Sequence, residues 1–331
     1  MSEQRAISRA LPASCGGRRA RAARDDKRSA LFRETPFETC QRTLLGIAWA
    51  LKPHRLGNLA PLARLWLASL VTSGRALPDA GVLTETSELA GIARDLSVPT
   101  LLAGYRRGLF PHGHLGAPKW LSPAMRGVLD LNDFHISTRL RSKMRQGRYT
   151  ITFDRDFEAV ITACAGRRPG QWHLTWIGPR IMHAYAQAFD EGHVHSFEVW
   201  NQNGDLAGGG YGVATGGVFV IESQFFRESN ASKIGFSVLA WHLAKWGFAM
   251  CDNKWLTATT AQMGFHEMPR AEYLRRLSAL GHEPVRAGRW EAEAGCEAVA
   301  DWRPGEERLQ AAGDLKRQEL AGAGAPGMEA R

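Results

Sequence analysis

Hydrophobic and polar positions in the first third of the chain repeat at the spacing of an α-helix. Apolar residues recur every three to four positions over 39–51, 59–71 and 98–108, which predicts three helices. Ser97 is typical of a helix start, and Gly108 is typical of a helix end. We therefore expect a helix-rich region at this end of the chain.

The centre of the chain alternates between extended and helical patterns. Three runs with the period of a β-strand, 194–200, 206–214 and 218–226, are separated by Asn-Gln-Asn-Gly-Asp and Thr-Gly-Gly, which predicts an antiparallel meander. The other expected elements are strands at 127–131, 150–153 and 248–252 and helices at 137–146, 156–164, 179–191, 230–246 and 257–263. This order predicts an α+β fold with a mainly antiparallel sheet flanked by helices, and excludes a regular parallel βαβ repeat.

Composition places the chain among globular proteins. Its 331 residues are 44% hydrophobic and 23% charged, and its five cysteines are scattered without C-x-x-C spacing, which favours a reducing cytoplasm. The two most apolar stretches are 43–51, cut short by Lys52 and Pro53, and 59–71, which contains Arg64. Neither is long enough to cross a bilayer, so we expect no membrane segment.

Charge and composition divide the chain into four parts. The net charge is +9, and residues 1–34 hold nine Lys and Arg against four Asp and Glu, which favours a basic flexible leader. We expect a helix-rich N-terminal domain at 35–132, a second domain with the α+β pattern at 133–283, and an extension at 284–331 whose Gly- and Ala-rich end resists packing. We expect a monomer.

Two acidic residues belong to apolar strand patterns, Glu222 within one and Asp252 at the end of another. Glu222 lies in Val-Phe-Val-Ile-Glu-Ser-Gln-Phe-Phe, where strand alternation predicts that it shares a face with Gln224. Asp252 ends Gly-Phe-Ala-Met-Cys-Asp. A buried carboxylate needs a partner, so Glu222 either pairs with a neighbour such as Arg227 or Lys233, or binds a substrate. A turn or a site role is equally open for Asp252.

The helix predicted after this strand begins at Asn230-Ala-Ser-Lys233. The N–H groups at a helix N-terminus bind an anion or a carbonyl oxygen, although every capped helix offers them. Asn230 and Ser232 therefore become site candidates only in combination with other motifs.

A cluster of cations without nearby acids follows His135. Arg141, Arg145 and Arg148 fall at i, i+4 and i+7, which predicts one helix face, and Arg139 and Lys143 lie beside them. An ordinary solvated face usually mixes both signs of charge. The missing acids favour contact with a nucleic-acid phosphate backbone.

Other common site chemistry is not indicated. The pairs His112/His114 and His193/His195 have no well-spaced third ligand nearby in sequence, so we expect no metal. The chain has no G-x-S-x-G elbow and no G-x-x-x-x-G-K-[ST] loop. Hydrolase and nucleoside-triphosphatase interpretations are therefore weak, and we expect no bound cofactor.

A set of ordered motifs resembles the leucyl/phenylalanyl-tRNA–protein transferase family over about residues 96–280. They are Tyr105-Arg-Arg-Gly-Leu-Phe-Pro111, Trp120-Leu-Ser-Pro-Ala-Met-Arg126, Thr175-Trp176-Ile177 with Tyr185, Gly192-His-Val-His-Ser-Phe-Glu-Val-Trp200, Gly208-Gly-Gly-Tyr-Gly-Val213, and Glu222-Ser-Gln-Phe225 with Asn230-Ala-Ser-Lys233. The resemblance implies a small N-terminal domain joined to a GNAT-type acyltransferase domain. It also implies transfer of Leu or Phe from its tRNA to proteins that begin with Lys or Arg, which marks them for degradation.

The resemblance implies roles for individual residues. Tyr105, Trp176 and Tyr185 would hold the tRNA 3′ adenosine and the aminoacyl group, Glu222 would lie near the reacting ester and amine, and Asp252 would lie at the acceptor. The basic helix would hold the acceptor stem. We expect a cleft shared by Glu222 and Asp252, with either acid assisting removal of a proton from the amine.

Four positions depart from the family pattern. They are His112, Gly210, Gln224 and, where the family has a Gln, Lys254. Gly210 and Gln224 predict a smaller-lined and more polar aminoacyl pocket. Lys254 predicts an ion pair with Asp252 or repulsion of a basic acceptor. Two alternatives remain: a GNAT-type enzyme that uses acyl-coenzyme A, and a catalytically silent binding module for tRNA or peptide.

Overall fold

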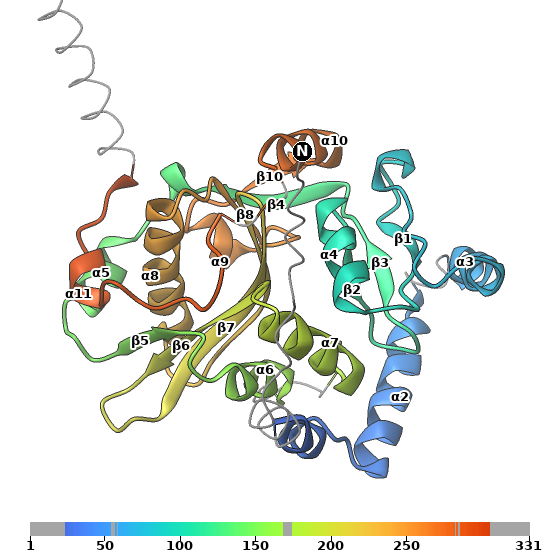
Figure 1. The fold of residues 1–331 in the computed structure, drawn as a ribbon, viewed down its shortest axis with the longest axis horizontal. Coiled ribbons are helices and arrows are strands. Elements are labelled where there is room, and N and C mark those ends of the chain that lie inside the picture. Colours follow the sequence, from blue (N-terminus) through green and yellow to red (C-terminus); the bar gives the residue numbers. More distant parts are fainter. Residues whose placement is uncertain are drawn as a thin grey trace, which may run out of the picture.

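The computed structural model describes residues 24–53, 57, 59–167, 174–281, 283 and 285–304, and the statements below concern these residues. They form two sheets with helices packed around them (Figure 1). The strands are β1 (Leu89–Ile92), β2 (Phe110–His112), β3 (Lys119–Leu121), β4 (Met125–Asp130), β5 (Thr150–Phe153), β6 (Val194–Trp200), β7 (Leu206–Thr215), β8 (Val218–Phe226), β9 (Met250–Asp252) and β10 (His266–Pro269).

Helices precede, connect and follow these strands. They are α2 (Pro36–Ala50), α3 (Leu59–Val71), α4 (Val98–Arg106), α5 (Thr138–Met144), α6 (Phe157–Ala165), α7 (Pro179–Asp190), α8 (Ala231–Lys245), α9 (Ala258–Ala261), α10 (Arg270–Ala279) and α11 (Cys296–Val299), with short 3-10 turns η2 (Ala80–Val82) and η3 (Leu131–Asp133). None of these helices combines the length and hydrophobicity that a bilayer crossing requires.

The larger sheet is mixed and has the order β10-β4-β9-β8-β7-β6-β5. The predicted meander is confirmed, because β6, β7 and β8 pair in antiparallel succession. The pair β8–β9 is parallel, and α8 connects these two strands. The α+β class is therefore confirmed.

Helices cover both faces of this sheet. The helices α6 and α7 pack on one face, against β6 and β7, whereas α8 packs on the other face with η3 and α11 nearby. Each face has its own apolar core: Tyr185 and Val220 belong to the first, and Phe219 and Phe236 belong to the second. Strand alternation explains this division, since neighbouring residues of a strand point to opposite faces.

The smaller sheet, β1-β3-β2, and helix α10 were not predicted from the sequence. Strands of three or four residues are too short to show a period, and Pro111 interrupts the pattern of β2. Strand β4 pairs with β9 and β10, so residues 125–130 join the larger sheet. This differs from the expected N-terminal domain, which extended to residue 132.

The leader predicted to be flexible, residues 1–34, is described only from residue 24, and residues 1–23 lie outside the described residues. The described part is ordered, which differs from the prediction. Residues 24–31 are helical. Arg28 is buried there and donates to Glu158 at 2.8 Å and to Asp190 at 2.5 Å. Phe32 is also buried. Ion pairs and an apolar anchor thus fix this segment against α6 and α7.

The C-terminal extension is described through residue 304 and packs on the second core. Trp290 is buried and stacks on His195, with ring centroids 3.6 Å apart. His195 Nδ1 lies 2.8 Å from Asp154, which also accepts from the backbone N–H of Trp290. The end that we expect to resist packing, 311–331, lies outside the described residues.

Candidate active site

Glu222 lies at a β-bulge in β8. The register between β7 and β8 shifts by one residue between Tyr211 and Gly212, and this leaves Glu222 opposite no residue of β7. The extra residue reverses the alternation, so Glu222 contacts Tyr185 on the α7 face whereas Gln224 lines a pocket on the α8 face. The prediction that Glu222 and Gln224 share a face is therefore wrong.

Two tyrosines from different helices hold one oxygen of Glu222. Tyr185 of α7 donates to Glu222 Oε2 at 2.9 Å, and its hydroxyl lies 2.5 Å from that of Tyr105 in α4. All three residues are buried. Burial and the negative charge of Glu222 raise the pKa of Tyr105 and of Tyr185 well above the ordinary value, so both stay protonated and act as donors. The structure brings these three predicted residues together.

Lys254 holds the other side of Glu222. Its Nζ lies 2.9 Å from Glu222 Oε1, an ion pair without hydrogen-bond geometry, and donates to the backbone carbonyl of Ile221. The side chain is buried, and its ammonium lies 5.4 Å from the centre of the Phe110 ring. Burial lowers the pKa of Lys254, and the charge of Glu222 opposes this shift. The predicted ion pair of Lys254 with Asp252 is wrong, because the ammonium points to Glu222.

Asp252 is fully buried, and its carboxylate is saturated with donors. Arg126 donates from Nε and Nη2, the latter at 2.6 Å, while Tyr273 donates at 2.8 Å and the backbone N–H of Lys254 at 2.7 Å. Burial alone would raise the pKa of Asp252, but the charge and hydrogen bonds of Arg126 outweigh it and hold that pKa below the ordinary value. These bonds suit a positioning residue and not a proton acceptor.

The two acids therefore do not share an open cleft. Lys254 lies between them, with its backbone N–H on Asp252 and its ammonium on Glu222. The prediction of a cleft shared by Glu222 and Asp252 is therefore wrong, because the side chain of Lys254 fills the space between the two carboxylates. The positive φ of Lys254, 65°, turns its side chain in this direction and costs about 1 kcal/mol of backbone strain.

A group of half-buried aromatic rings adjoins Lys254. His112 stacks on Trp176 with ring centroids 5.1 Å apart, and Trp255 lies edge-on to His112 at 5.7 Å and to Phe110 at 5.3 Å. Burial, then His114 and Lys254, lower the pKa of His112 to about 3, so its ring is neutral at pH 7. Trp255 is a site residue that the sequence analysis missed, although it directly follows Lys254. Flat neutral rings of this kind suit stacking against a nucleic-acid base.

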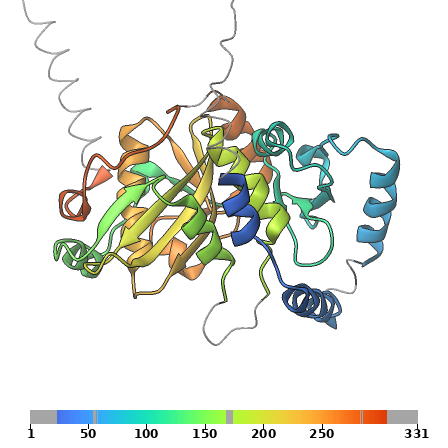
Figure 2. The ribbon, with the colours of Figure 1, turned by 60° about the horizontal axis from the view of Figure 1, so that its bottom comes forward.

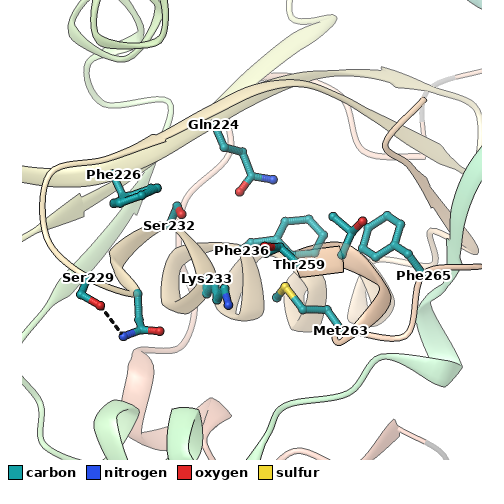
Figure 3. Close-up of a pocket in the computed structure, with 11 residues that line it drawn as sticks. Gln224, Phe226, Ser229, Ser232, Lys233, Phe236, Thr259, Met263 and Phe265 are labelled. Carbon is teal, nitrogen blue, oxygen red and sulfur yellow. Dashed lines mark hydrogen bonds between the residues drawn. The ribbon is translucent and has the colours of Figure 1, made fainter. Parts of the chain in front are cut away.

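A pocket of about 300 Å³ lies on the α8 face (Figure 3). Gln224 and Phe226 reach it from β8, and Ser232 and Lys233 from the first turn of α8. Its other lining residues are Ser229, Asn230, Phe236, Thr259, Thr260, Met263 and Phe265. The predicted candidates Gln224, Asn230 and Ser232 thus lie together, apart from Glu222 across the sheet.

Gly210 does not enlarge this pocket. A Cβ atom at Gly210 would lie 2.7 Å from Cγ of Gln224 and 2.8 Å from the Phe197 ring. The space that a side chain at 210 would need is therefore already filled by its neighbours. The prediction that Gly210 gives the pocket a smaller lining is therefore wrong, because Gln224 and Phe197 fill the volume that a side chain at position 210 would take.

The basic cluster is divided by the fold. Helix α5 ends at Met144, and Gly147 follows with a positive φ of 60°, so Arg148 lies outside the predicted helix face. Arg141 is buried and donates to the backbone carbonyls of Ile136, Ala300 and Trp302. Arg141 therefore holds the C-terminal segment in place and cannot contact phosphate.

The other four cations of this cluster reach the surface to different degrees. Arg139, Arg145 and Arg148 are exposed and Lys143 is half-buried. Arg145 pairs with Asp301, an acid 156 positions further along the chain. Arg145 has no acid near it in sequence, but the fold places Asp301 beside it. This ion pair competes with a phosphate contact.

Metal-binding geometry is not found in the part of the chain that the structure describes. No group of three or more His, Cys, Asp or Glu side chains there is placed to hold an ion. The rings of His112 and His114 contact each other at 5.3 Å and belong to the aromatic group. These histidines thus contribute stacking surface.

Comparison with known proteins assigns the class. Two family models match in sequence, "Leucyl/phenylalanyl-tRNA protein transferase N-terminal domain" over residues 94–124 and "Leucyl/phenylalanyl-tRNA protein transferase" over residues 128–278. These models span Tyr105, Trp176, Tyr185, Glu222 and Asp252. The chain is therefore an aminoacyltransferase by class.

Curated relatives narrow this class to one family. Leucyl/phenylalanyl-tRNA–protein transferases from Anaeromyxobacter sp. and Pseudomonas syringae are 42% and 41% identical to this chain and are each covered over 91% of their length, against 64% and 63% of this chain. That of Alkalilimnicola ehrlichii is 37% identical over 71% of this chain and 91% of its own. The chain belongs to the leucyl/phenylalanyl-tRNA–protein transferase family.

A solved structure adds nothing to this assignment. The structure of L-PGS from Bacillus licheniformis is 12% identical, covers 55% of this chain and 60% of its own, and superposes with a TM-score of 0.29. That score is too low to support an argument about the fold.

Proposed function

We propose that this protein transfers an amino acid, Leu or Phe by family, from aminoacyl-tRNA to the N-terminal α-amino group of a protein. The observation that carries the proposal is the buried Glu222, held by Tyr185 and Lys254 beside the half-buried rings of His112, Trp176 and Trp255. An acceptor that begins with Lys or Arg, and degradation of the product, are parts of the same proposal.

The proposed reaction requires no nucleophile from the protein. The acceptor amine attacks the ester carbonyl carbon, a C–N bond forms, the C–O bond to the tRNA 3′ oxygen breaks, and that oxygen takes the proton that the amine loses. Transfer from an ester to an amine is downhill, so positioning supplies much of the acceleration. This explains a site built from Glu222, Lys254 and tyrosine hydroxyls with no nucleophile motif.

Each residue then has a role in this proposal. The rings of Trp176 and the neutral His112 stack on the terminal adenosine. Glu222 accepts a hydrogen bond from the acceptor amine, while Tyr105 and Tyr185 fix its orientation. Asp252 positions Lys254 through the backbone N–H and takes no proton itself.

The pairing of β8 with β9 ends beside Glu222, and our proposal places the donor ester there. Their last paired residues are Val220 and Asp252, and β8 continues beyond them to Phe226. In our proposal the ester lies near Glu222, and the amino-acid side chain reaches the pocket of Figure 3 past Gln224. The amide of Gln224 makes that pocket more polar than an all-apolar one.

The finer fold and location assignments belong to the same proposal. A parallel β8–β9 pair joined through α8 inside an otherwise antiparallel sheet supports a GNAT-type domain. A chain with scattered cysteines and a tRNA substrate suits the cytoplasm.

One transfer assay separates this function from its alternatives. The purified protein is incubated with tRNA charged with labelled Leu, Phe or other amino acids, or with labelled acetyl-coenzyme A, and with peptides that differ only in the first residue. Label transfer from Leu- or Phe-tRNA to a Lys or Arg peptide supports the proposal. Transfer from the thioester alone, or tRNA retention without transfer, would replace it with the acyl-coenzyme A enzyme or the silent binding module.

Substitution of Glu222 connects this assay to the site. Glu222→Gln keeps the shape but removes the charge, and we expect transfer to fall at least 100-fold with tRNA affinity retained. Glu267→Gln on β10 is the matched control, because Glu267 is exposed there. Full activity of Glu222→Gln would remove this residue from the mechanism.

A further inference from the structure

Helix α2 presents an uncharged apolar stripe to solvent. Phe37, Cys40, Leu44, Ile47 and the C-cap residue Leu51 lie on this stripe. The exposed fractions of Phe37 and Leu44 are 74% and 62%, and those of Ile47 and Leu51 are 41% and 56%. A helix of a globular protein usually turns its apolar stripe inward, so this outward stripe indicates an interface.

The opposite side of α2 is already packed against the protein. Gly46 is buried, and a Cβ atom there would lie 2.8 Å from the backbone oxygen of His114. The ring of Trp49 lies 4.8 Å from that of His114, and Arg42 pairs with Glu34 at 2.9 Å. These contacts fix the rotation of α2 and leave the apolar stripe facing away from the protein. Helix α2 itself lies at the edge of the ribbon (Figure 2).

The stripe has the spacing of a coiled-coil seam. Its residues, 37, 40, 44, 47 and 51, are separated by three, four, three and four positions, which is the a/d pattern of a heptad repeat. Such a seam is complementary to another helix with the same spacing. Residues at the flanking e and g positions, Gln41, Thr43, Ala48 and Ala50, carry no charge.

We propose that a second copy of this chain docks its own α2 on this stripe, forming a homodimer. A two-fold axis places each surface against itself, so an uncharged seam with uncharged flanks meets no like-charge repulsion in either helix orientation. A lipid surface would instead favour cations along the edges of the stripe, and Gln41, Thr43, Ala48 and Ala50 supply none.

The proposed contact is small and therefore weak. A 15-residue helix is about 22 Å long, and a pair of such seams falls in the class of interfaces below about 1,200 Å². We expect a dissociation constant in the range of about 1–50 µM, as for weak transient complexes. Helix α2 lies outside residues 94–278, so the dimer does not depend on the proposed function. It differs from the monomer expected from the sequence.

Sedimentation equilibrium of the full chain tests the dimer between about 1 and 100 µM. We expect the mean mass of the wild type to rise toward twice 36.5 kDa, and Leu44→Glu to weaken association at least tenfold. Ala271→Glu is the matched control, because it adds the same charge to an exposed position of α10, away from α2. Circular dichroism checks that both variants keep the wild-type helix content.

Cysteine cross-linking in a Cys15→Ser background then gives the orientation. Cys40 is exposed on the seam, so oxidation links Cys40 to Cys40 in a parallel pair. An antiparallel pair places a positions opposite d positions, so Leu44→Cys or Leu51→Cys links to Cys40 of the other copy. Either product supports the proposal.

Three results would overturn the dimer. They are a wild type that stays monomeric at 100 µM, a dimer unaffected by Leu44→Glu, and a monomer that binds phosphatidylcholine–phosphatidylglycerol vesicles in a Leu44-dependent way. The second would place the interface elsewhere, and the third would assign the stripe to a lipid surface.

Discussion

Lys254 and Glu222 form a buried ion pair, with Nζ 2.9 Å from Oε1. Lys254 also donates to the Ile221 carbonyl, on the part of β8 that extends beyond its pairing with β9. The ammonium thus neutralises the carboxylate of Glu222 and also donates a hydrogen bond to a backbone carbonyl of β8 that has no partner in β9. This pairing makes position 254 the clearest place to separate charge from shape in this site.

We expect Lys254→Gln and Lys254→Met to differ. Both substitutions leave the carboxylate of Glu222 buried without its cation, but the amide of Gln still offers a donor to Ile221 and Glu222, whereas Met offers none. Loss of the partner of a buried charge costs about 3–5 kcal/mol. We expect the Met variant to lose about that much unfolding free energy in urea denaturation and the Gln variant clearly less. Equal losses would contradict the role of the hydrogen bond to Ile221.

Tyr185→Phe tests the orientation of Glu222. The substitution removes the hydroxyl that joins Tyr105 to Glu222, and loss of a buried hydrogen bond costs about 1–3 kcal/mol. We expect transfer to fall about tenfold, with kcat lowered more than KM is raised. Tyr149→Phe is the control, since Tyr149 bonds to Glu228 and not to Glu222. Similar kinetics in both variants would show that the hydroxyl chain is structural only.

Asp252→Asn tests the positioning role of Asp252. Its pKa is lowered in the folded protein, so its carboxylate stabilises the fold above the ordinary value of 3.8, and this stabilisation is lost as pH falls through the lower folded pKa. We expect the variant to lose about 3–5 kcal/mol at pH 7 and to show a flatter acid dependence of urea unfolding below pH 3.8.

Asp205→Asn provides the comparison for Asp252, because Asp205 is exposed in the β6–β7 turn. We expect a change within about 0.5 kcal/mol there. If Asp252→Asn unfolded like this control at pH 7, the saturated carboxylate would not stabilise the fold.

Arg148→Ala and Arg141→Ala separate tRNA contact from structure. Arg148 is exposed, so its loss weakens tRNA binding a few-fold and reduces the slope of log affinity against log salt by about one. Arg141 is buried on three backbone carbonyls, and its loss instead lowers the unfolding free energy by about 1–3 kcal/mol. Filter binding across salt concentrations and urea unfolding measure the two effects. A stable Arg141→Ala protein with weakened tRNA binding would reverse this assignment.

The sequence could predict the elements whose signals are local. The meander follows from the alternation and turn residues of 194–226, and the motifs around Tyr105, Tyr185 and Glu222 pointed to a site that the fold brings together. The bulge at Glu222 has no such signal, because the apolar and polar pattern continues through it without a Gly or a break. The opposite faces of Glu222 and Gln224 were therefore not predictable.

Ion pairs between residues far apart in the chain could not be predicted from the sequence either. Arg126 binds Asp252 across 126 positions, and Asp301 reaches Arg145 across 156. Counting the charges of sequence neighbours suggests that Asp252 is available to substrate and that Arg145 has no acidic partner. Both judgements fail because tertiary contacts, and not neighbours in sequence, decide which charges are neutralised.

Arg126 also ties the two sheets to each other. Its Nη1 donates to the carbonyl of Gly108, just before β2 of the small sheet, while its other nitrogens hold Asp252 of the large one. Trp120 of the small sheet and Val128 of the large one share a single apolar core. Separate unfolding of the smaller sheet would expose a guanidinium and a core tryptophan, so we expect the two sheets to unfold in one cooperative transition.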